Sequence, residues 1–418
     1  MSWNRIILSF ITLFVLCTGI AQAKELRVLS EDEQIVQGLL YDEYGAYESS
    51  RRVFGKLYDE TGSEVYLFRE ITAALLSKSH ISQSIERIKL WDKKHPNTLE
   101  VRRLLIPLYL TNRQVQEAKV EAEYLAERSN KTKDLDLASN PYLYSGEFKK
   151  ALDLLARAYN KDFDEDILLR MAMIMDEYTG ERKKAIQLLE THRRMNVVQS
   201  NILYFKLLAF YVKENDIDGL LDIYKVLYEN EKNEQYLDKI IDAYAYKRDY
   251  DGAISFLEES KANDKILYEL YKSKKYYKKA LLLVDKLYKN DKDAKWLAEK
   301  GILLYENAAN KNDKSMISKV VSSFEKALSL GVDDSLYLNY YGYTLIENQI
   351  DVKKGIKIVK DALIQQPNNI YYLDSLAWGH YKENECKKAH DLMRKVVEKE
   401  GLTEPEIIEH WDAIRKCK

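Results

Sequence analysis

The sequence predicts an all-α protein, built as a solenoid of about eleven stacked helical hairpins. Three observations point to this fold. Only 15 Gly and 5 Pro among 418 residues leave little material for the many tight turns of an all-β protein. Charged residues make up 32% of the chain, which suits solvated helix faces. A position that is mostly occupied by small residues also recurs about every 34 residues, and a fixed period of this length indicates stacked helical repeats.

The first 23 residues are expected to be a secretory signal peptide. Arg5 supplies a positive charge, residues 6–20 are mostly apolar, and residues 21–23 (AQA) place small residues where signal peptidase needs them. The apolar run is short for a bilayer core, which needs about 20 apolar residues, so we favour a cleaved signal over an uncleaved anchor. Leu16 precedes Cys17 where a lipoprotein signal has a small residue, so lipidation is not expected.

Most repeat units combine a small residue with an apolar residue four positions later. The apolar residue recurs in all eleven units, whereas Leu220 and Val320 are bulky where the other units have a small residue. A small residue early in the second helix lets the first helix pack close, near the lower limit of about 8–10 Å between axes. The apolar residue one turn later fills the groove between the two helices, and stacking on neighbouring hairpins buries the remaining faces. The register residues are Ser50, Ser84, Ala118, Ala151, Ala185, Leu220, Ala253, Ala280, Val320, Gly355 and Ala389.

This pattern resembles the tetratricopeptide repeat (TPR) family across essentially the whole chain after the signal. The clearest units end with Pro, at Pro96 and Pro367, and residues 338–343 (LNYYGY) and 373–378 (LDSLAW) resemble the paired C-terminal repeats of exported bacterial repeat proteins. The resemblance implies a right-handed α-solenoid of about eleven TPR-like helical hairpins with a C-terminal capping helix. Ala377 stands where such repeats usually have Gly, a mild departure that keeps a small residue at the contact.

Irregular spacings predict where the array changes. Pro141 falls inside a first helix, which is expected to be short or kinked. The 27-residue step from Ala253 to Ala280 predicts a shortened helix, and the 40-residue step after it predicts a polar loop around residues 307–318. We therefore expect a signal peptide at 1–23, an N-terminal TPR-like array at 24–292, and a C-terminal TPR block at 293–418. A capping helix over 405–416 is expected to cover the last repeat with Ile408 and Trp411.

Catalysis is not supported by the sequence, so we expect no enzyme, no catalytic residue and no cofactor. The chain contains no GxSxG, no phosphate-binding Gly-rich loop with Lys, and neither HExxH nor CxxC. Its carboxylates lie on expected helix faces among Lys and Arg, where solvation and salt bridges explain them. A net charge of −2 gives no electrostatic case for binding nucleic acid.

The histidines and cysteines of the last 40 residues allow two interpretations. A metal site would need three or four ligands to converge, and we favour packing roles for these residues with no metal bound. Loss of the signal removes Cys17 and leaves two cysteines, which could pair as a disulfide in an oxidising compartment if their Cα atoms lie within about 7 Å. The residues concerned are His380, Cys386, His390, His410 and Cys417, with Cys386 and Cys417 as the disulfide candidates.

The 32 Tyr exceed what the repeat frame requires. Aromatic residues and Arg anchor many protein interfaces, although packing between repeats is the alternative for each residue here. The residues expected to line the concave face as a partner-binding groove are Tyr178, Phe205, Tyr246, Tyr305, Tyr343, Tyr371, Trp378 and Tyr381. Charged residues expected among them are Arg69, Arg103, Arg170, Asp238, Asp242 and Asp374.

The favoured function is a non-enzymatic scaffold or adaptor, exported to the periplasm of a Gram-negative bacterium, that holds a protein or extended peptide in this groove. The resemblance and the expected location imply a role in assembling an envelope complex, such as a secretion, pilus or flagellar structure, with outer-membrane association left open. The first alternative is a periplasmic protein that binds glycan or peptidoglycan, since an aromatic groove can stack sugar rings. The second is an enzyme with a metal site at the C-terminal histidines and cysteines.

Overall fold

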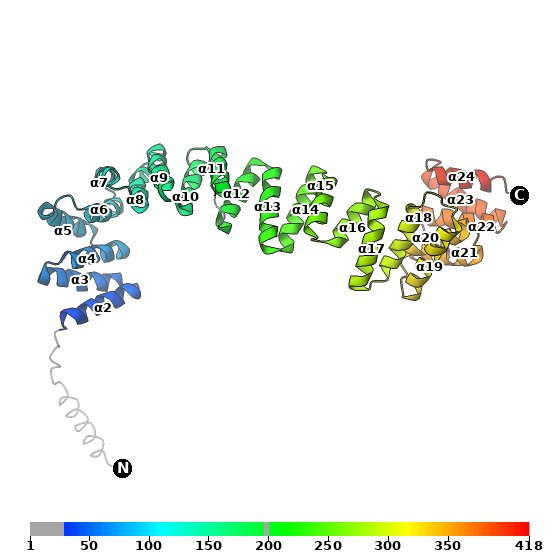
Figure 1. Cartoon of the computed structure of the whole chain (residues 1–418), viewed down its shortest axis with the longest axis horizontal. Coiled ribbons are helices and arrows are strands. Elements are labelled where there is room, and N and C mark those ends of the chain that lie inside the picture. Colours follow the sequence, from blue (N-terminus) through cyan, green and yellow to red (C-terminus); the bar gives the residue numbers. More distant parts are fainter. Residues whose placement is uncertain (1–28, 196–199, 418) are drawn as a thin grey trace, which may run out of the picture. The chain divides into compact units, whose positions relative to one another are not determined.

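The computed structural model describes residues 29–195 and 200–417, and within them every regular element is a helix (Figure 1). The signal peptide expected at 1–23 lies outside the described residues. The first helices of the hairpins are α2 (Glu31–Glu43), α4 (Glu64–Ser77), α6 (Leu99–Thr111), α8 (Thr132–Tyr144), α10 (Glu165–Glu177), α12 (Asn201–Glu214), α14 (Glu234–Lys247), α16 (Asp264–Ser273), α18 (Lys295–Glu306), α20 (Ser335–Glu347) and α22 (Ile370–Lys382). The second helices are α3 (Tyr47–Thr61), α5 (Ile81–Lys94), α7 (Val115–Arg128), α9 (Phe148–Asp162), α11 (Arg182–Met195), α13 (Ile217–Glu231), α15 (Tyr250–Ser260), α17 (Tyr277–Asp291), α19 (Lys314–Ser329), α21 (Val352–Gln365) and α23 (Cys386–Glu400). The last helix is α24 (Pro405–Ile414).

The repeat register defined by the small residues is confirmed. Each register residue lies in the second helix of a hairpin, from Ser50 in α3 to Ala389 in α23, and all are buried except the partly exposed Leu220. The apolar residue four positions later is also buried in most units, as at Phe54 and Met393. The described residues therefore form eleven helical hairpins followed by a capping helix, which confirms the all-α solenoid.

The chain divides into two compact units, and the division falls between Gly219 and Leu220, within α13. In the second unit, one hydrophobic cluster centres on Tyr268 between α13 and α18. A second cluster around Tyr341 joins α18–α22, and a third around Met393 joins α20–α24. The boundary expected at residue 293 stays a prediction.

The irregular spacings have specific structural outcomes. Helix α8 runs through Pro141 and ends three residues later, so the proline neither shortens nor stops it. The short 27-residue step is absorbed by two helices, α15 with 11 residues and α16 with 10. The inserted segment is shorter than expected, because Asp313 caps α19 by accepting from the backbone N–H of Ser315 at 2.8 Å and so starts the helix at Lys314.

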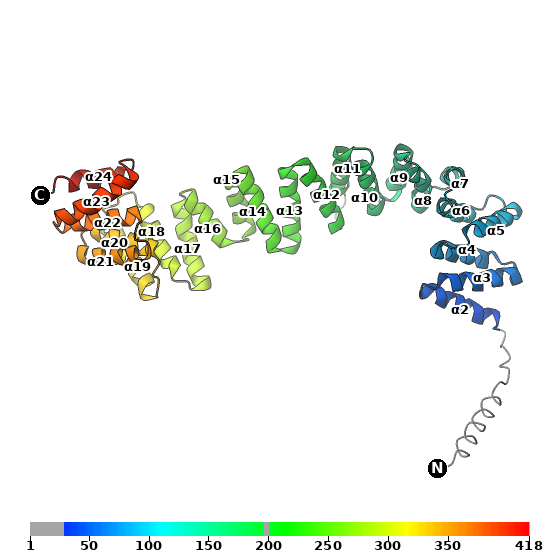
Figure 2. The ribbon, with the colours of Figure 1, turned by 180° about the vertical axis from the view of Figure 1, so that it is seen from behind.

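The capping helix α24 packs against α22 and α23, as both views show (Figure 1, Figure 2). Its buried side chains are Ile407, His410 and Ile414, whereas Ile408 is 38% exposed. The expectation that Ile408 covers the last repeat was therefore wrong by one position, while Trp411 does pack against that cluster. No helix in the described part of the chain is both long and apolar enough to cross a bilayer.

Candidate functional site

A pocket of about 370 Å³ lies in the second unit, on the face formed by the first helices α18, α20 and α22, with α24 at its edge. We call it the tyrosine pocket. The lining residues are Tyr305, Glu306, Leu336, Asn339, Tyr340, Tyr343, Thr344, Asn369, Tyr371, Tyr372, Asp374, Ser375 and Glu406.

Helical periodicity explains why these residues meet. Leu336, Asn339, Tyr340 and Tyr343 are spaced i, i+3, i+4 and i+7 along α20, so they share one face of that helix. The repeat then brings equivalent positions of neighbouring hairpins together, because Tyr305, Tyr340 and Asp374 each lie fifteen residues before the register residue of their unit.

The charge of the lining is entirely negative. Glu306, Asp374 and Glu406 carry carboxylates, and the lining includes no Lys, Arg or His. Burial raises the pKa of Tyr305 and Tyr340 above the ordinary value, and burial together with the Glu406 carboxylate raises that of Tyr343. The phenols therefore stay protonated at neutral pH and present neutral rings with hydroxyl donors.

The edge formed by α24 is fixed through polar contacts and ring stacking, and the contact between His410 and Asp374 is buried. His410 Nδ1 lies 2.9 Å from Asp374 Oδ2, and because a carboxylate only accepts, this nitrogen carries the proton. The His410 ring stacks on Trp378 with centroids 4.0 Å apart, and the Trp378 indole N–H donates to Glu347 at 2.5 Å. The Tyr343 hydroxyl donates to Glu406 across the pocket. The capping helix is thus part of the site.

Outside the pocket lining, Glu299 of α18 is 6% exposed and accepts hydrogen bonds from three side chains of neighbouring helices. The hydroxyls of Tyr268 and Tyr337 donate to it at 2.6 Å and 2.8 Å, and Lys272 Nζ donates at 2.8 Å. This carboxylate therefore holds α16, α18 and α20 together, and α18 and α20 carry pocket residues.

Substituting Glu299→Gln is expected to lower the free energy of unfolding of the second unit by about 1–2 kcal/mol, because the amide keeps the volume but loses the charged partner of Lys272. Chemical denaturation of the full chain measures the change. The control is Glu269→Gln on the exposed surface of α16, which should change the unfolding free energy by less than about 0.5 kcal/mol. Equal effects of the two substitutions would contradict a supporting role for Glu299.

The eight aromatic residues expected in the groove have different environments. Tyr305, Tyr343 and Tyr371 line the tyrosine pocket. Trp378 is buried in the third cluster, and Tyr381 stacks on it with centroids 4.8 Å apart. Neither ring lines the tyrosine pocket.

The remaining three lie outside the tyrosine pocket. Tyr178 is stacked on Phe148 and still 56% exposed, in the first unit. Phe205, also in the first unit, is 49% exposed, and Tyr246 of the second unit is 75% exposed. The role of these three residues in binding a partner stays a prediction.

The charged residues expected in the groove are in part engaged in contacts between repeats. Arg103 of α6 makes two hydrogen bonds, of 2.7 Å and 2.8 Å, to the buried carboxylate of Asp134 on α8, and these bonds lower the pKa of Asp134. Arg170 binds Asp136 and Asn140 in the same way between α10 and α8. These guanidinium groups therefore join neighbouring repeats.

Sequence reasoning missed Tyr340, Glu306 and Glu406 as site residues. The sequence does contain a signal for Tyr340, because this residue is the repeat equivalent of Tyr305, which the sequence predicts in the groove. Glu406 had no such signal, since its place depends on how α24 folds back on α22.

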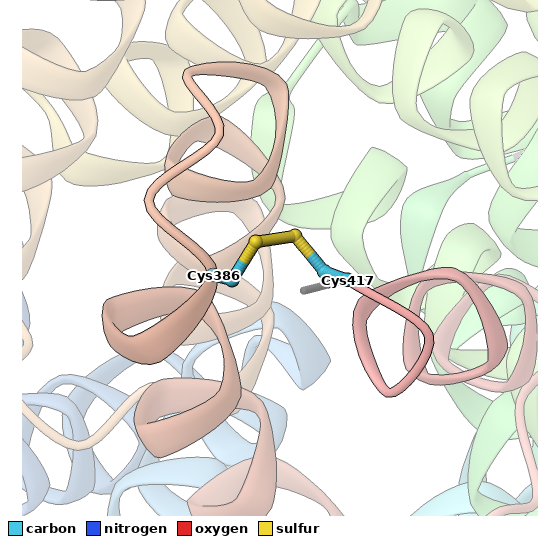
Figure 3. Close-up of a disulfide and its surroundings, with 2 residues drawn as sticks. All are labelled: Cys386 and Cys417. Atoms are coloured by element: carbon cyan, nitrogen blue, oxygen red, sulfur yellow. A yellow bond between two sulfur atoms is a disulfide. The ribbon is translucent and has the colours of Figure 1, made fainter.

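The C-terminal cysteines are brought together at the edge of α23 and the end of the capping helix (Figure 3). The Cα atoms of Cys386 and Cys417 lie 5.5 Å apart, within the range that a disulfide requires. Cys386 is the first residue of α23.

The C-terminal histidines are engaged elsewhere. His380 Nδ1 pairs with Glu385, His410 pairs with Asp374, and the His390 ring lies 5.3 Å from that of Trp411. Among residues 29–195 and 200–417, no three His, Cys, Asp or Glu side chains are grouped as a metal site would require.

Comparison with known proteins found no matching family model and no matching curated protein. Among solved structures, the chain is similar to the Cut9–Hcn1 hetero-tetramer of APC/C, with 10% identity over 92% of this chain and 96% of that chain and a TM-score of 0.38. It is also similar to YrrB, a TPR protein described as having an unusual peptide-binding site, with 13% identity over 49% of this chain and 96% of that chain and a TM-score of 0.30. A third likeness is to the TPR2AB domain of yeast Sti1 in complex with pHSP90, with 15% identity over 68% and 98% of the two chains and a TM-score of 0.25. Because all three TM-scores are low, we base the functional proposal on the pocket alone.

Proposed function

We propose that this chain is a non-enzymatic scaffold that binds an extended segment of a partner protein in the tyrosine pocket. The observation that carries the proposal is the pocket itself, which three successive repeats and the capping helix form together. Tyr371 is 54% exposed at this site although aromatic side chains are mostly buried, and exposed tyrosines beside a concave surface are typical anchors of protein interfaces.

The aliphatic hydroxyl groups in the pocket, those of Thr344 and Ser375, are not placed as activated nucleophiles, which supports a binding function over a catalytic one. Thr344 Oγ1 donates to the carbonyl of Tyr340 at 2.7 Å, and Ser375 Oγ donates to the carbonyl of Tyr371 at 2.9 Å. Each hydroxyl thus bonds within its own helix, whereas an activated nucleophile needs a base within hydrogen-bond reach.

We further propose that the chain is exported to the periplasm of a Gram-negative bacterium, with cleavage after Ala23, and helps to assemble an envelope complex. The cysteines support an oxidising location, because only Cys386 and Cys417 follow the signal and their spacing permits a disulfide. The secretion, pilus and flagellar structures of the envelope are the assemblies that we consider.

The proposal predicts that a photo-crosslinking amino acid in place of Tyr371 joins the chain to a partner protein in the cells that make it. Mass spectrometry of the adduct would identify both the partner and the crosslinked segment. The matched control places the same amino acid at Tyr246, which is 75% exposed and lies outside the pocket in the same unit.

Two outcomes would contradict the proposal. Equal adducts from positions 371 and 246 would show that contact with Tyr371 is not specific. An absence of protein adducts from position 371, with peptidoglycan fragments protecting the pocket in hydrogen exchange, would favour the glycan-binding alternative.

A further inference from the structure

We infer that the tyrosine pocket receives a cationic side chain, lysine or arginine, from the bound segment of the partner. This inference rests on the proposed function and adds the chemistry of the ligand. It follows from the charge of the lining, from the tyrosine rings in that lining and from the hydrogen-bonding groups around them.

The charge of the lining favours a cation. Glu306 comes from α18, Asp374 from α22 and Glu406 from α24, so carboxylates surround the pocket from three helices. Asp374 is hydrogen-bonded to His410, and Glu406 accepts from Tyr343. Glu306, the last residue of α18, has no hydrogen-bond or ion-pair partner among residues 29–195 and 200–417. Asp374 is buried and Glu306 is half-buried, whereas Glu406 is exposed. Burial of the first two carboxylates strengthens their attraction for a cation compared with open solvent.

The aromatic rings add a second attraction for the same ligand. Tyr305, Tyr340, Tyr343 and Tyr371 line the pocket, and the π-face of a neutral aromatic ring attracts ammonium and guanidinium groups. One cation of the chain already contacts a ring of the lining, because Lys311 Nζ is 4.4 Å from the centroid of Tyr305.

Hydrogen bonding and size favour the side chain of a peptide. Asn339 Oδ1, buried at the wall, accepts no hydrogen bond within the described part of the chain, and the carboxylates are acceptors too. Lysine and arginine side chains donate several hydrogen bonds and accept none, so they match such a wall. A volume of about 370 Å³ is at the small end of ligand pockets and suits one long side chain.

The test measures binding of short peptides to the full chain by calorimetry. The probes are Ac-Ser-Gly-Lys-Gly-Ser-NH2, its arginine counterpart, and a counterpart with norleucine, which keeps the aliphatic stem but lacks the charge. We expect at least one cationic peptide to bind about tenfold more tightly than the norleucine peptide at about 50 mM salt, with a smaller advantage at about 500 mM because salt screens the carboxylates.

The variant Glu306→Gln/Glu406→Gln should remove most of the preference for the cationic peptides. Both substitutions keep side-chain shape, and the glutamine carbonyl at position 406 can still accept from Tyr343. The matched control is Glu409→Gln, on the exposed face of the same capping helix, which should leave the affinities unchanged.

Three results would overturn the inference. The first is that the norleucine peptide binds as tightly as the cationic peptides. The second is that the double variant keeps the preference for the cationic peptides. The third is that putrescine binds as tightly as the peptides, which would indicate a free amine as the ligand. The photo-crosslinking experiment at Tyr371 distinguishes failure of the cationic ligand from failure of the proposed scaffold function. A partner segment without Lys or Arg would overturn the cationic ligand alone, and a lack of any partner at position 371 would overturn the scaffold.

Discussion

Substituting Gly355→Val is expected to lower the free energy of unfolding of the C-terminal hairpins by about 3 kcal/mol, because the site leaves no room for a side chain. A Cβ at Gly355 would lie 2.7 Å from the carbonyl oxygen of Gly342 and 2.7 Å from Ile346 Cγ1. The carbonyl belongs to the backbone of α20, so the clash can be relieved only by moving α20 away from α21. The same helix carries Tyr340 and Tyr343, and its displacement would widen the tyrosine pocket.

Hydrogen exchange with mass spectrometry can measure this loss of stability in α20 and α21 themselves. A local method is needed because repeat proteins can open locally, and a single global unfolding transition would not report such local opening. Protection should fall in peptides from α20 and α21. The matched control is Lys353→Val, which introduces valine at another position of α21, where the native lysine side chain is 84% exposed. This control should change the free energy of protection by less than about 0.5 kcal/mol. Unchanged protection in Gly355→Val would mean that the two helices tolerate a wider spacing.

The repeat frame could be predicted because its determinants are local. A small residue and an apolar residue one turn later, as at Ala151 and Leu155, specify the contact within one hairpin, and both residues are fully buried. The environment of a ring on a first helix depends instead on elements that come later in the chain. Trp378 was expected in the groove, and His410 of the capping helix covers it.

The rotation of the capping helix is a second limit, because successive residues of an α-helix point about 100° apart. Ile407 is 2% exposed and Ile408 is 38% exposed, and nothing in the local sequence distinguishes these adjacent isoleucines. The same rotation decides that Glu406 faces the tyrosine pocket. The candidate site could therefore be predicted in its tyrosines but not in the carboxylate that the cap contributes.

Removing the expected disulfide with Cys386→Ser/Cys417→Ser should lower the stability of the capping helix by about 3 kcal/mol, because the bond closes a loop between residues 31 positions apart and restricts the unfolded chain. The consequence for function comes through α24. This helix carries Glu406 in the pocket wall and His410 on Asp374, so its opening would remove both groups from the site. Hydrogen exchange in α24 should become roughly a hundredfold faster, and binding to the tyrosine pocket should weaken.

Reductant provides the control for this prediction. It should reproduce the effect of the double substitution in the parent chain and have no further effect in the variant, which has no bond left to reduce. Titration of the chain purified from the envelope should find no reactive thiol at Cys386 or Cys417, because an oxidising compartment keeps such a pair bonded. The prediction would be wrong if both thiols were reactive and hydrogen exchange in α24 stayed slow with and without reductant. That result would show that Ile407 and Ile414 hold the capping helix by packing alone. The contribution of this helix to the pocket would then not depend on redox state.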